Sequence, residues 1–178
     1  TKSHQKGFDR LVAMFALLRQ QHPQAHLVIL GMDALPYHGV DQQAKLRRML
    51  PQASHSLHFP GRVGNVQDWY ERADLFLLPS RYEGFPNVLL EAMASGCCCV
   101  SSDCPQGPAE LISDGVNGRL VQNDANPKTW ADLVSMLLAD SDQRRRLADR
   151  ALEVRQRFSE GRLRRCFMSG VSQLVGDD

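Results

Sequence analysis

Short apolar runs alternate with helical patterns along most of this chain of 178 residues, and that alternation limits the folds open to it. Residues 26–31 (HLVILG) and 74–79 (DLFLLP) are almost wholly apolar, as strands buried on both faces are. The interval before the first run, residues 6–21, places apolar side chains at helical spacing. Strands that alternate with helices in this way form βαβ units. The sequence therefore predicts an α/β domain whose parallel sheet is flanked by helices on both faces.

Turn and capping residues place the remaining elements. We expect further strands at residues 57–59, 98–102 and 118–121. We expect further helices at residues 41–50, 66–72, 86–95 and 108–113, with Asp41 as the N-cap of the first. From Pro127 the pattern is helical almost to the end, with breaks near Asp140 and Ser159. We interpret residues 1–178 as a single domain in which residues 140–178 form a helical tail.

Charge and hydropathy exclude several classes of partner. The formal net charge is +1, so no overall field attracts a nucleic acid or an acidic surface. The tail is rich in arginine, but acidic residues are interleaved with the arginines and aromatic residues are sparse. No apolar run approaches the roughly 20 residues that a membrane-spanning helix needs. We expect no nucleic-acid partner and no spanning segment.

The cysteines predict packing rather than chemistry. There are five, an odd number, and three are adjacent, which is no disulfide framework; they are Cys97, Cys98, Cys99, Cys104 and Cys166. Zinc binding is the alternative, but the Cys-x-Cys spacing is shorter than the usual spacing of ligands and no histidine lies nearby. We favour buried packing of small side chains, no metal site, and a reducing cytoplasm.

The stretch after residues 74–79 carries the most chemistry. Gly84 allows a ligand to approach the backbone closely, and Pro86 suits the first turn of a helix. The amides of Asn87, Val88 and Leu89 would then be unpaired at the positive end of the helix dipole. Such an end binds anions, and a diphosphate suits it.

Two carboxylates bracket this turn, and two roles are open to them. Glu83 and Glu91 could act as an acid/base pair, for which about 5 Å between the two groups would be required in a retaining glycosidase. The alternative is that each accepts hydrogen bonds from neutral hydroxyl groups on either side of the phosphates. The second role fits better, since a carboxylate aimed at a phosphate would repel it.

Residues 83–91 (EGFPNVLLE) resemble the E-x7-E element of the retaining GT-B glycosyltransferases, the glycosyl transferases group 1 or glycosyltransferase family 4. Other blocks follow in the order of that family: KGFD at 6–9, FPG at 59–61, ADLFLLPS at 73–80, EAMASG at 91–96, GPAELI at 107–112 and DGVNGRLV at 114–121. The resemblance covers roughly residues 6–140. It implies a Rossmann-like domain, the C-terminal half of a GT-B fold whose N-terminal acceptor domain is absent from this sequence.

The resemblance also implies roles for individual residues. Glu83, Gly84 and Phe85 would bind the donor sugar, and Glu91 would bind the ribose. The diphosphate would be bound by Lys6, Asn87 and Val88. Arg62 and Val63 would lie on the side of the base. No metal ligand and no certain catalytic residue is implied within this domain.

The function implied is hexosyl transfer with retention from a nucleotide-diphosphate sugar, with UDP or GDP as the nucleotide and no further cofactor. The acceptor would be a glycan or a lipid-linked molecule in bacterial glycan biosynthesis, and the fragment alone should be inactive. The resemblance implies a cytoplasmic enzyme and leaves open a peripheral association with the inner face of the membrane through the absent domain. Two alternatives stay open: a sugar-nucleotide epimerase of related fold, and a non-catalytic nucleotide-binding module. An NAD-type dehydrogenase is disfavoured because no G-x-G-x-x-G follows an expected strand.

Overall fold

The computed structural model describes residues 3–32 and 41–159. Within these ranges helices and strands alternate as the sequence predicts, and the order of the elements is α1 (Ser3–Lys6), α2 (Phe8–Gln21), β1 (Leu27–Leu30), α3 (Gln42–Met49), the 3-10 helix η1 (Pro51–Ser56), β2 (Leu57–Gly61), α4 (Val66–Arg72), β3 (Phe76–Leu78), α5 (Asn87–Ala94), β4 (Cys99–Asp103), α6 (Pro108–Leu111), β5 (Arg119–Gln122), α7 (Pro127–Ala139), α8 (Ser141–Ala151) and α9 (Val154–Arg157).

Local signals place several helix ends correctly. The Asp41 carboxylate accepts a hydrogen bond of 2.9 Å from the Ala44 amide at the start of α3, as an N-cap does. Asn126 and Asp140 cap α7 and α8 in the same way. Gly96 follows α5 with a positive φ of 74°, which ends the helix in the left-handed conformation that glycine favours. Cys166 and the predicted tail beyond residue 159 lie outside the described residues.

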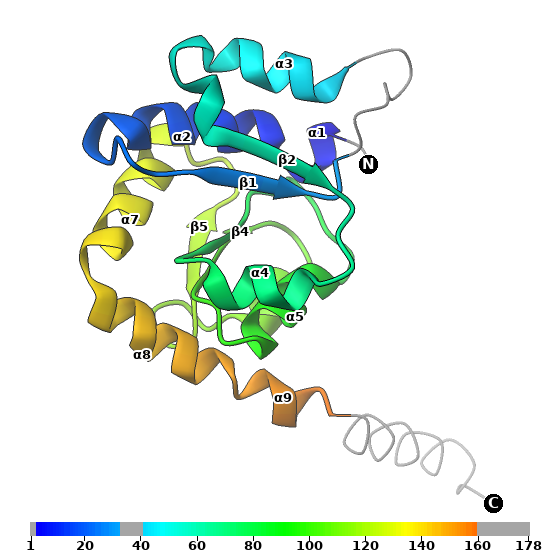
Figure 1. The fold of residues 1–178 in the computed structure, drawn as a ribbon. Helices are drawn as coiled ribbons and strands as arrows, with labels where there is room; N and C mark the ends of the chain where they lie inside the picture. The colour runs from blue at the N-terminus through cyan, green and yellow to red at the C-terminus, as the bar shows by residue number, and fades with distance from the viewer. Residues whose placement is uncertain (1–2, 33–40, 160–178) are drawn as a thin grey trace, which may run out of the picture.

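All the strand pairs are parallel, but they form two sheets rather than the single sheet that we expected. β1 pairs with β2 in one sheet, and β4 lies between β3 and β5 in the other. Parallel strands with helices beside them confirm the predicted α/β fold. Among the described strands β1 and β3 do not pair with each other, and residues of both line one cavity. Figure 1 shows α2 and α3 beside the β1–β2 pair, with α4 and α5 beside the other sheet.

The same cavity explains a second difference. We expected residues 26–31 to be buried on both faces, yet burial alternates along β1 and Val28 is 38% exposed. Val28 borders the cavity, so one face of the strand is left uncovered. β4, by contrast, is buried throughout until Asp103, as a strand between two covered faces should be.

Two hydrophobic clusters pack against opposite faces of β4. Val100 belongs to the larger cluster, which α2 and α7 dominate. Cys99 belongs to the smaller one, with Leu89 and Met93 of α5 and Val154 of α9. Successive side chains of a strand point to opposite faces, so this one strand joins both cores. No helix among the described residues is long and apolar enough to cross a bilayer.

Candidate functional site

The described residues that directly follow β2 and β3 lie at the carboxyl ends of these parallel strands, where open α/β sheets bind ligands. A cavity of about 1640 Å³ opens there. Five of the predicted site residues line it: Lys6, Arg62, Val63, Val88 and Glu91. The other four, Glu83, Gly84, Phe85 and Asn87, do not line this cavity and lie in or next to the turn ahead of α5. The structure thus brings two of the three predicted phosphate residues, and the predicted base and ribose residues, to one cavity, whereas Asn87 and the predicted sugar residues are not part of its lining.

An ion pair joins two of the predicted residues. The Lys6 Nζ lies 2.8 Å from the Glu83 Oε1, and the Ser80 hydroxyl donates a 2.6 Å hydrogen bond to the same oxygen. The Glu83 side chain is only 6% exposed, whereas that of Lys6 is 30% exposed. A carboxylate so buried requires partners, and this one has a cation and a hydroxyl donor. Its charge is therefore balanced beside the opening.

Gly7 brings Lys6 to this position. Its φ is +66°, and a Cβ built on it would lie 2.0 Å from the Pro79 carbonyl oxygen. No side chain could occupy that space, so only glycine allows α1 to approach the loop after β3 this closely. Lys6 thus supplies the cation, and Gly7 allows the close approach that places this cation beside Glu83.

Arg81 holds the same two segments together from the other side. Its guanidinium donates to both oxygens of the Asp9 carboxylate, at 2.8 and 2.7 Å, and to the His4 carbonyl at 2.7 Å. The Asn123 side chain donates a 2.9 Å hydrogen bond to the Arg81 carbonyl. The hydrogen bonds from Arg81 lower the pKa of the Asp9 carboxyl, and burial opposes this only in part. A bidentate pair of this kind fixes orientation as well as distance.

The turn ahead of α5 differs from our prediction in its hydrogen bonds. We expected three free amides, but the Asn87 amide donates to the Phe85 carbonyl at 3.0 Å and the Leu89 amide to the Pro86 carbonyl at 2.9 Å. The prediction is wrong for these two because the helix begins at Asn87, with Pro86 as its N-cap, and the tight turn supplies acceptors. In the part of the chain that the structure describes, the Val88 amide keeps no backbone acceptor.

A close contact behind the turn shapes it. Gly107 has a φ of +91°, and a Cβ there would lie 2.5 Å from the Pro86 Cδ and 2.9 Å from the Gly84 carbonyl oxygen. Because Gly107 has no side chain, the backbone ahead of α6 packs directly against this turn. Phe85 is exposed, and its ring centroid lies 5.8 Å from that of Phe158.

Glu91 has a neighbour that the sequence did not indicate. Tyr70 on α4 is buried, and this burial, with the charge and the hydrogen bonding of the Glu91 carboxylate, raises the pKa of Tyr70 to about 12. Glu91 itself is exposed to solvent and borders the cavity. A neutral phenol beside it can donate a hydrogen bond that orients the carboxylate.

Sequence reasoning missed Tyr70, Ser80 and Arg81. Ser80 and Arg81 stand immediately after a predicted strand, which is where polar ligands of an α/β site occur, and that position could have identified them. Tyr70 gave no such signal, because it lies on a helix as an ordinary amphipathic residue.

The four cysteines among the described residues pack as predicted. Cys97, Cys98, Cys99 and Cys104 are buried and free of disulfides. Burial raises the pKa of Cys98 to about 12 and raises that of Cys99 as well, while a hydrogen bond with Cys99 lowers the pKa of Cys97. Among the described residues there is no group of three or more side chains suited to hold a metal ion.

The family model described as Glycosyl transferases group 1 matches residues 2–154. The chain belongs to this family. A D-inositol 3-phosphate glycosyltransferase of Xylanimonas cellulosilytica is 38% identical to this group 1 chain over 161 residues, which are 86% of the chain and 36% of the relative. The chain spans about a third of the length of such curated relatives.

Solved structures of GT-B glycosyltransferases share the fold of this group 1 domain. Anabaena Alr3699/HepE, crystallised in complex with UDP, superposes with a TM-score of 0.82 at 24% identity, over 95% of this chain and 46% of that one. The C-terminal domain of the group 1 protein LpcC from Francisella tularensis gives a TM-score of 0.73 at 25% identity, over 86% of this chain and 80% of that one. The expected C-terminal GT-B half fits both comparisons.

Proposed function

We propose that this group 1 domain binds a nucleotide-diphosphate sugar, with UDP or GDP as its nucleotide, as the donor half of a retaining glycosyltransferase. The observation that carries the proposal is the neutralised Lys6–Glu83 pair beside the turn that starts α5, at the rim of a cavity lined by Val88 and Glu91. Structures of Anabaena HepE bound to UDP and to UDP-glucose support a donor of this class.

Each part of the donor has a chemically suited partner at this rim. A diphosphate would accept hydrogen bonds from the free Val88 amide and from the Asn87 amide once its turn opens. The positive end of α5 and the Lys6 ammonium supply favourable charge. Glu91, oriented by Tyr70, would accept bonds from the ribose hydroxyls. Arg62 and Val63 border the same cavity, where the base would lie.

Glu83 suits a hydroxyl of the transferred sugar. As a carboxylate it can only accept hydrogen bonds. Lys6 and Ser80 both contact its Oε1, which leaves Oε2 available to accept a hydrogen bond from the sugar. Gly84 and Phe85 would contribute backbone groups beside it. As the bond to the diphosphate breaks, charge grows on the leaving phosphate, where Lys6 and the helix end can stabilise it without a metal.

We further propose that the chain works together with an N-terminal GT-B domain that contributes the glycan or lipid-linked acceptor. The cytoplasm is the compartment that supplies nucleotide sugars to such an enzyme, and peripheral membrane association would come through the acceptor domain. This chain alone should bind the donor and transfer little.

Donor binding is tested by calorimetry with UDP, GDP and their glucose or mannose conjugates. We expect Glu91→Ala to weaken all of them by roughly 10- to 100-fold, since about 1.5–3 kcal/mol accompanies a hydrogen bond to a charged group. Asp132→Ala removes an exposed carboxylate from α7 and should leave affinity unchanged. Unaltered binding in Glu91→Ala would refute the ribose assignment.

A second comparison separates a sugar-binding site from a simple nucleotide module. Glu83→Gln should weaken the intact sugar nucleotide about 5-fold or more, yet leave the free nucleoside diphosphate nearly unaffected. Equal affinity for both ligands, unchanged in the variant, would favour the nucleotide-binding module instead. Recovery of epimerised donor from the full-length enzyme would favour the epimerase.

A further inference from the structure

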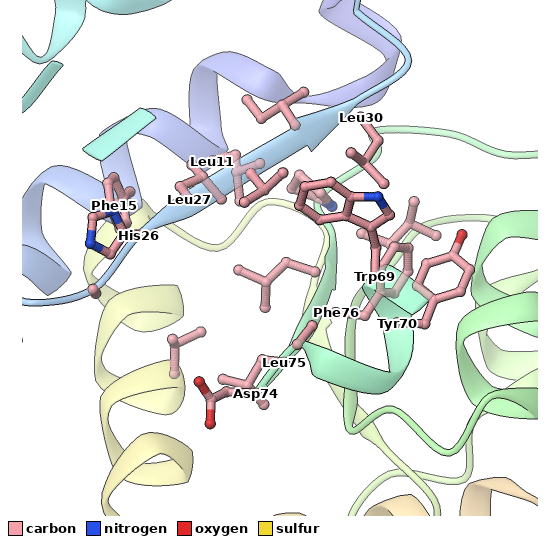
Figure 2. A pocket seen from close by; sticks show the side chains of 18 of the residues that line it. Leu11, Phe15, His26, Leu27, Leu30, Trp69, Tyr70, Asp74, Leu75 and Phe76 are labelled. Atoms are coloured by element: carbon pink, nitrogen blue, oxygen red, sulfur yellow. The ribbon is translucent and has the colours of Figure 1, made fainter. Parts of the chain in front are cut away.

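The walls of the large cavity are mainly apolar and offer few hydrogen-bond partners to a sugar. Figure 2 shows Leu11, Leu27 and Leu75 among the side chains on these walls. None of the residues that we assign to the donor sugar lines the cavity. A hexose carries several hydroxyl groups, and hydroxyl groups taken out of water require hydrogen-bond partners. We therefore expect further partners of the sugar outside the cavity, around the turn that contains Glu83.

The loop between β4 and α6 packs along that turn. At one end of the loop, Cys104 is buried, and this burial, with the charge of Glu83, raises the pKa of its thiol, which places the thiol beside Glu83. At the other end, a Cβ on Gly107 would lie 2.9 Å from the Gly84 carbonyl oxygen. Between these two contacts Gln106 is exposed to solvent. The loop therefore presents the Gln106 side chain next to the turn.

Gln106 has an unusual backbone conformation. Its φ is +64°, and among the residues that the structure describes it is the only non-glycine residue with a positive φ. A Cβ makes this left-handed region unfavourable, whereas glycine adopts it readily. Strained residues of this kind cluster at ligand sites, where the surrounding contacts hold them in place. The backbone alone would favour glycine at this position, which indicates that the glutamine side chain has a use.

The carboxamide of Gln106 has free hydrogen-bonding capacity. Within the described part of the chain it makes no hydrogen bond to another protein group. It carries two N–H donors and an acceptor oxygen, so it matches a hydroxyl group, which also donates and accepts. Because it is uncharged, it does not repel a neighbouring diphosphate.

The position of Gln106 is within reach of a sugar on the turn. Consecutive Cα atoms are about 3.8 Å apart, so the Gln106 Cα lies within roughly 8 Å of the Gly84 carbonyl oxygen. An extended glutamine side chain spans about 5 Å. A hexose bound at the turn by Glu83 would therefore lie within hydrogen-bonding reach of the carboxamide.

We propose that Gln106 is a specificity-determining residue whose carboxamide hydrogen-bonds a hydroxyl group of the hexose that Glu83 contacts. This assignment rests on the donor-binding function proposed above. The left-handed backbone fixes the direction in which the side chain leaves the loop, and the packing of Gly107 against Gly84 fixes the distance of the loop from the turn. Hexoses that differ at that hydroxyl group should bind with different affinities, because the mismatched sugar leaves the carboxamide without its partner.

Two substitutions separate the contact from the strain. Gln106→Ala removes the carboxamide and keeps the strained backbone, whereas Gln106→Gly removes both. By calorimetry we expect each variant to bind UDP-glucose, UDP-galactose or GDP-mannose about 3- to 10-fold more weakly, and to bind UDP and GDP as before. Gln106→Gly should nevertheless have a Tm about 2–4 °C above that of Gln106→Ala. Gln52→Ala, at an exposed position of η1, is the control and should change neither quantity.

Donor analogues that lack one sugar hydroxyl group locate the contact. The wild-type protein should bind the analogue without the contacted hydroxyl group more weakly than the complete sugar nucleotide. Gln106→Ala should bind the two equally, a result that a merely structural role of Gln106 would not give. A loss of discrimination at no hydroxyl group would contradict the proposal.

The remaining outcomes distinguish this inference from the proposed function. Unchanged affinity for sugar nucleotides in both Gln106 variants, together with weaker binding by Glu83→Gln, would overturn the role of Gln106 and leave the proposed function standing. An equal loss of affinity for UDP and GDP would assign Gln106 to the nucleotide and also overturn the proposal. A Tm of Gln106→Gly below that of Gln106→Ala would remove the strain on which the inference rests. If Glu83→Gln bound every sugar nucleotide as the wild type does, the proposed function itself would fail.

Discussion

The Lys6 ammonium and the Glu83 carboxylate lie 2.8 Å apart although 77 residues separate them in the chain. The pair ties the start of the domain to the turn ahead of α5. Lys6 is held there by the close approach of Gly7 to Pro79, and Glu83 by the Ser80 hydroxyl. The proposed anion site and the carboxylate that we propose for the donor sugar are thus parts of one packed unit.

Loss of Lys6 should expose the dependence of Glu83 on its partner. Lys6→Met leaves a nearly buried carboxylate without its cation, and we expect the free energy of unfolding to fall by about 1–3 kcal/mol in urea denaturation. The double variant Lys6→Met/Glu83→Gln should lose less than the sum of the single changes. Lys128→Met, in an exposed pair, is the control and should change stability by less than about 0.5 kcal/mol. Strict additivity would mean that the pair contributes nothing.

The Asp9–Arg81 pair should make stability depend on pH in the acid range. Because the folded pKa of Asp9 lies below its ordinary 3.8, the pair contributes fully above that value and is lost as the pH falls through the lowered folded pKa. Asp9→Asn should therefore be less stable by about 1 kcal/mol at neutral pH, with the difference vanishing in strong acid. Thermal unfolding across this range measures it, with Asp142→Asn as the exposed counterpart. A constant difference at every pH would contradict the assignment.

Tyr70 should resist ionisation. Its pKa of about 12 lies above the ordinary 10.0, so the neutral phenol stabilises the fold below pH 10 and this contribution is lost as the pH rises toward 12. We expect ultraviolet titration to show one tyrosine ionising late, and Tyr70→Phe to remove that step. The variant should also bind nucleotide less tightly, by roughly 2- to 10-fold, since Glu91 loses a neutral donor. If every tyrosine ionised near pH 10, the phenol of Tyr70 would be exposed to solvent, which would contradict the assignment.

Gly107 and Gly115 form a matched pair of glycines with positive φ. A Cβ at Gly107 meets Pro86 and the Gly84 carbonyl, while a Cβ at Gly115 meets nothing within 4 Å. Gly107→Ala should therefore cost about 2–4 kcal/mol and distort the turn, against about 1 kcal/mol for Gly115→Ala from backbone strain alone. Denaturation and donor titration measure both effects. Similar losses in the two variants would show that the contact with the turn is unimportant.

The elements that sequence reasoning predicted well are those whose signals are local. The predicted bounds of α4, residues 66–72, match the structure, and the start of α3 follows from Asp41 and the end of α5 from Gly96. Each depends on residues within one or two turns of the element, so one sequence contains the information.

What could not be predicted depends on segments distant in sequence. The pairing of Lys6 with Glu83 requires the sheet to bring α1 beside the loop after β3. The acceptor of the Asn87 amide depends on how tightly the backbone turns at Phe85, which residue types alone do not determine. The two-sheet arrangement depends on whether β1 and β3 meet, which no local pattern reports.

β4 belongs to both hydrophobic clusters, through Val100 on one face and Cys99 on the other. If β4 moves, both clusters lose packing, so the two clusters should unfold together. Heating should therefore give one cooperative transition rather than two. A ligand held at the rim by α5 should protect α2 and α7 across the domain as much as the helix that it touches.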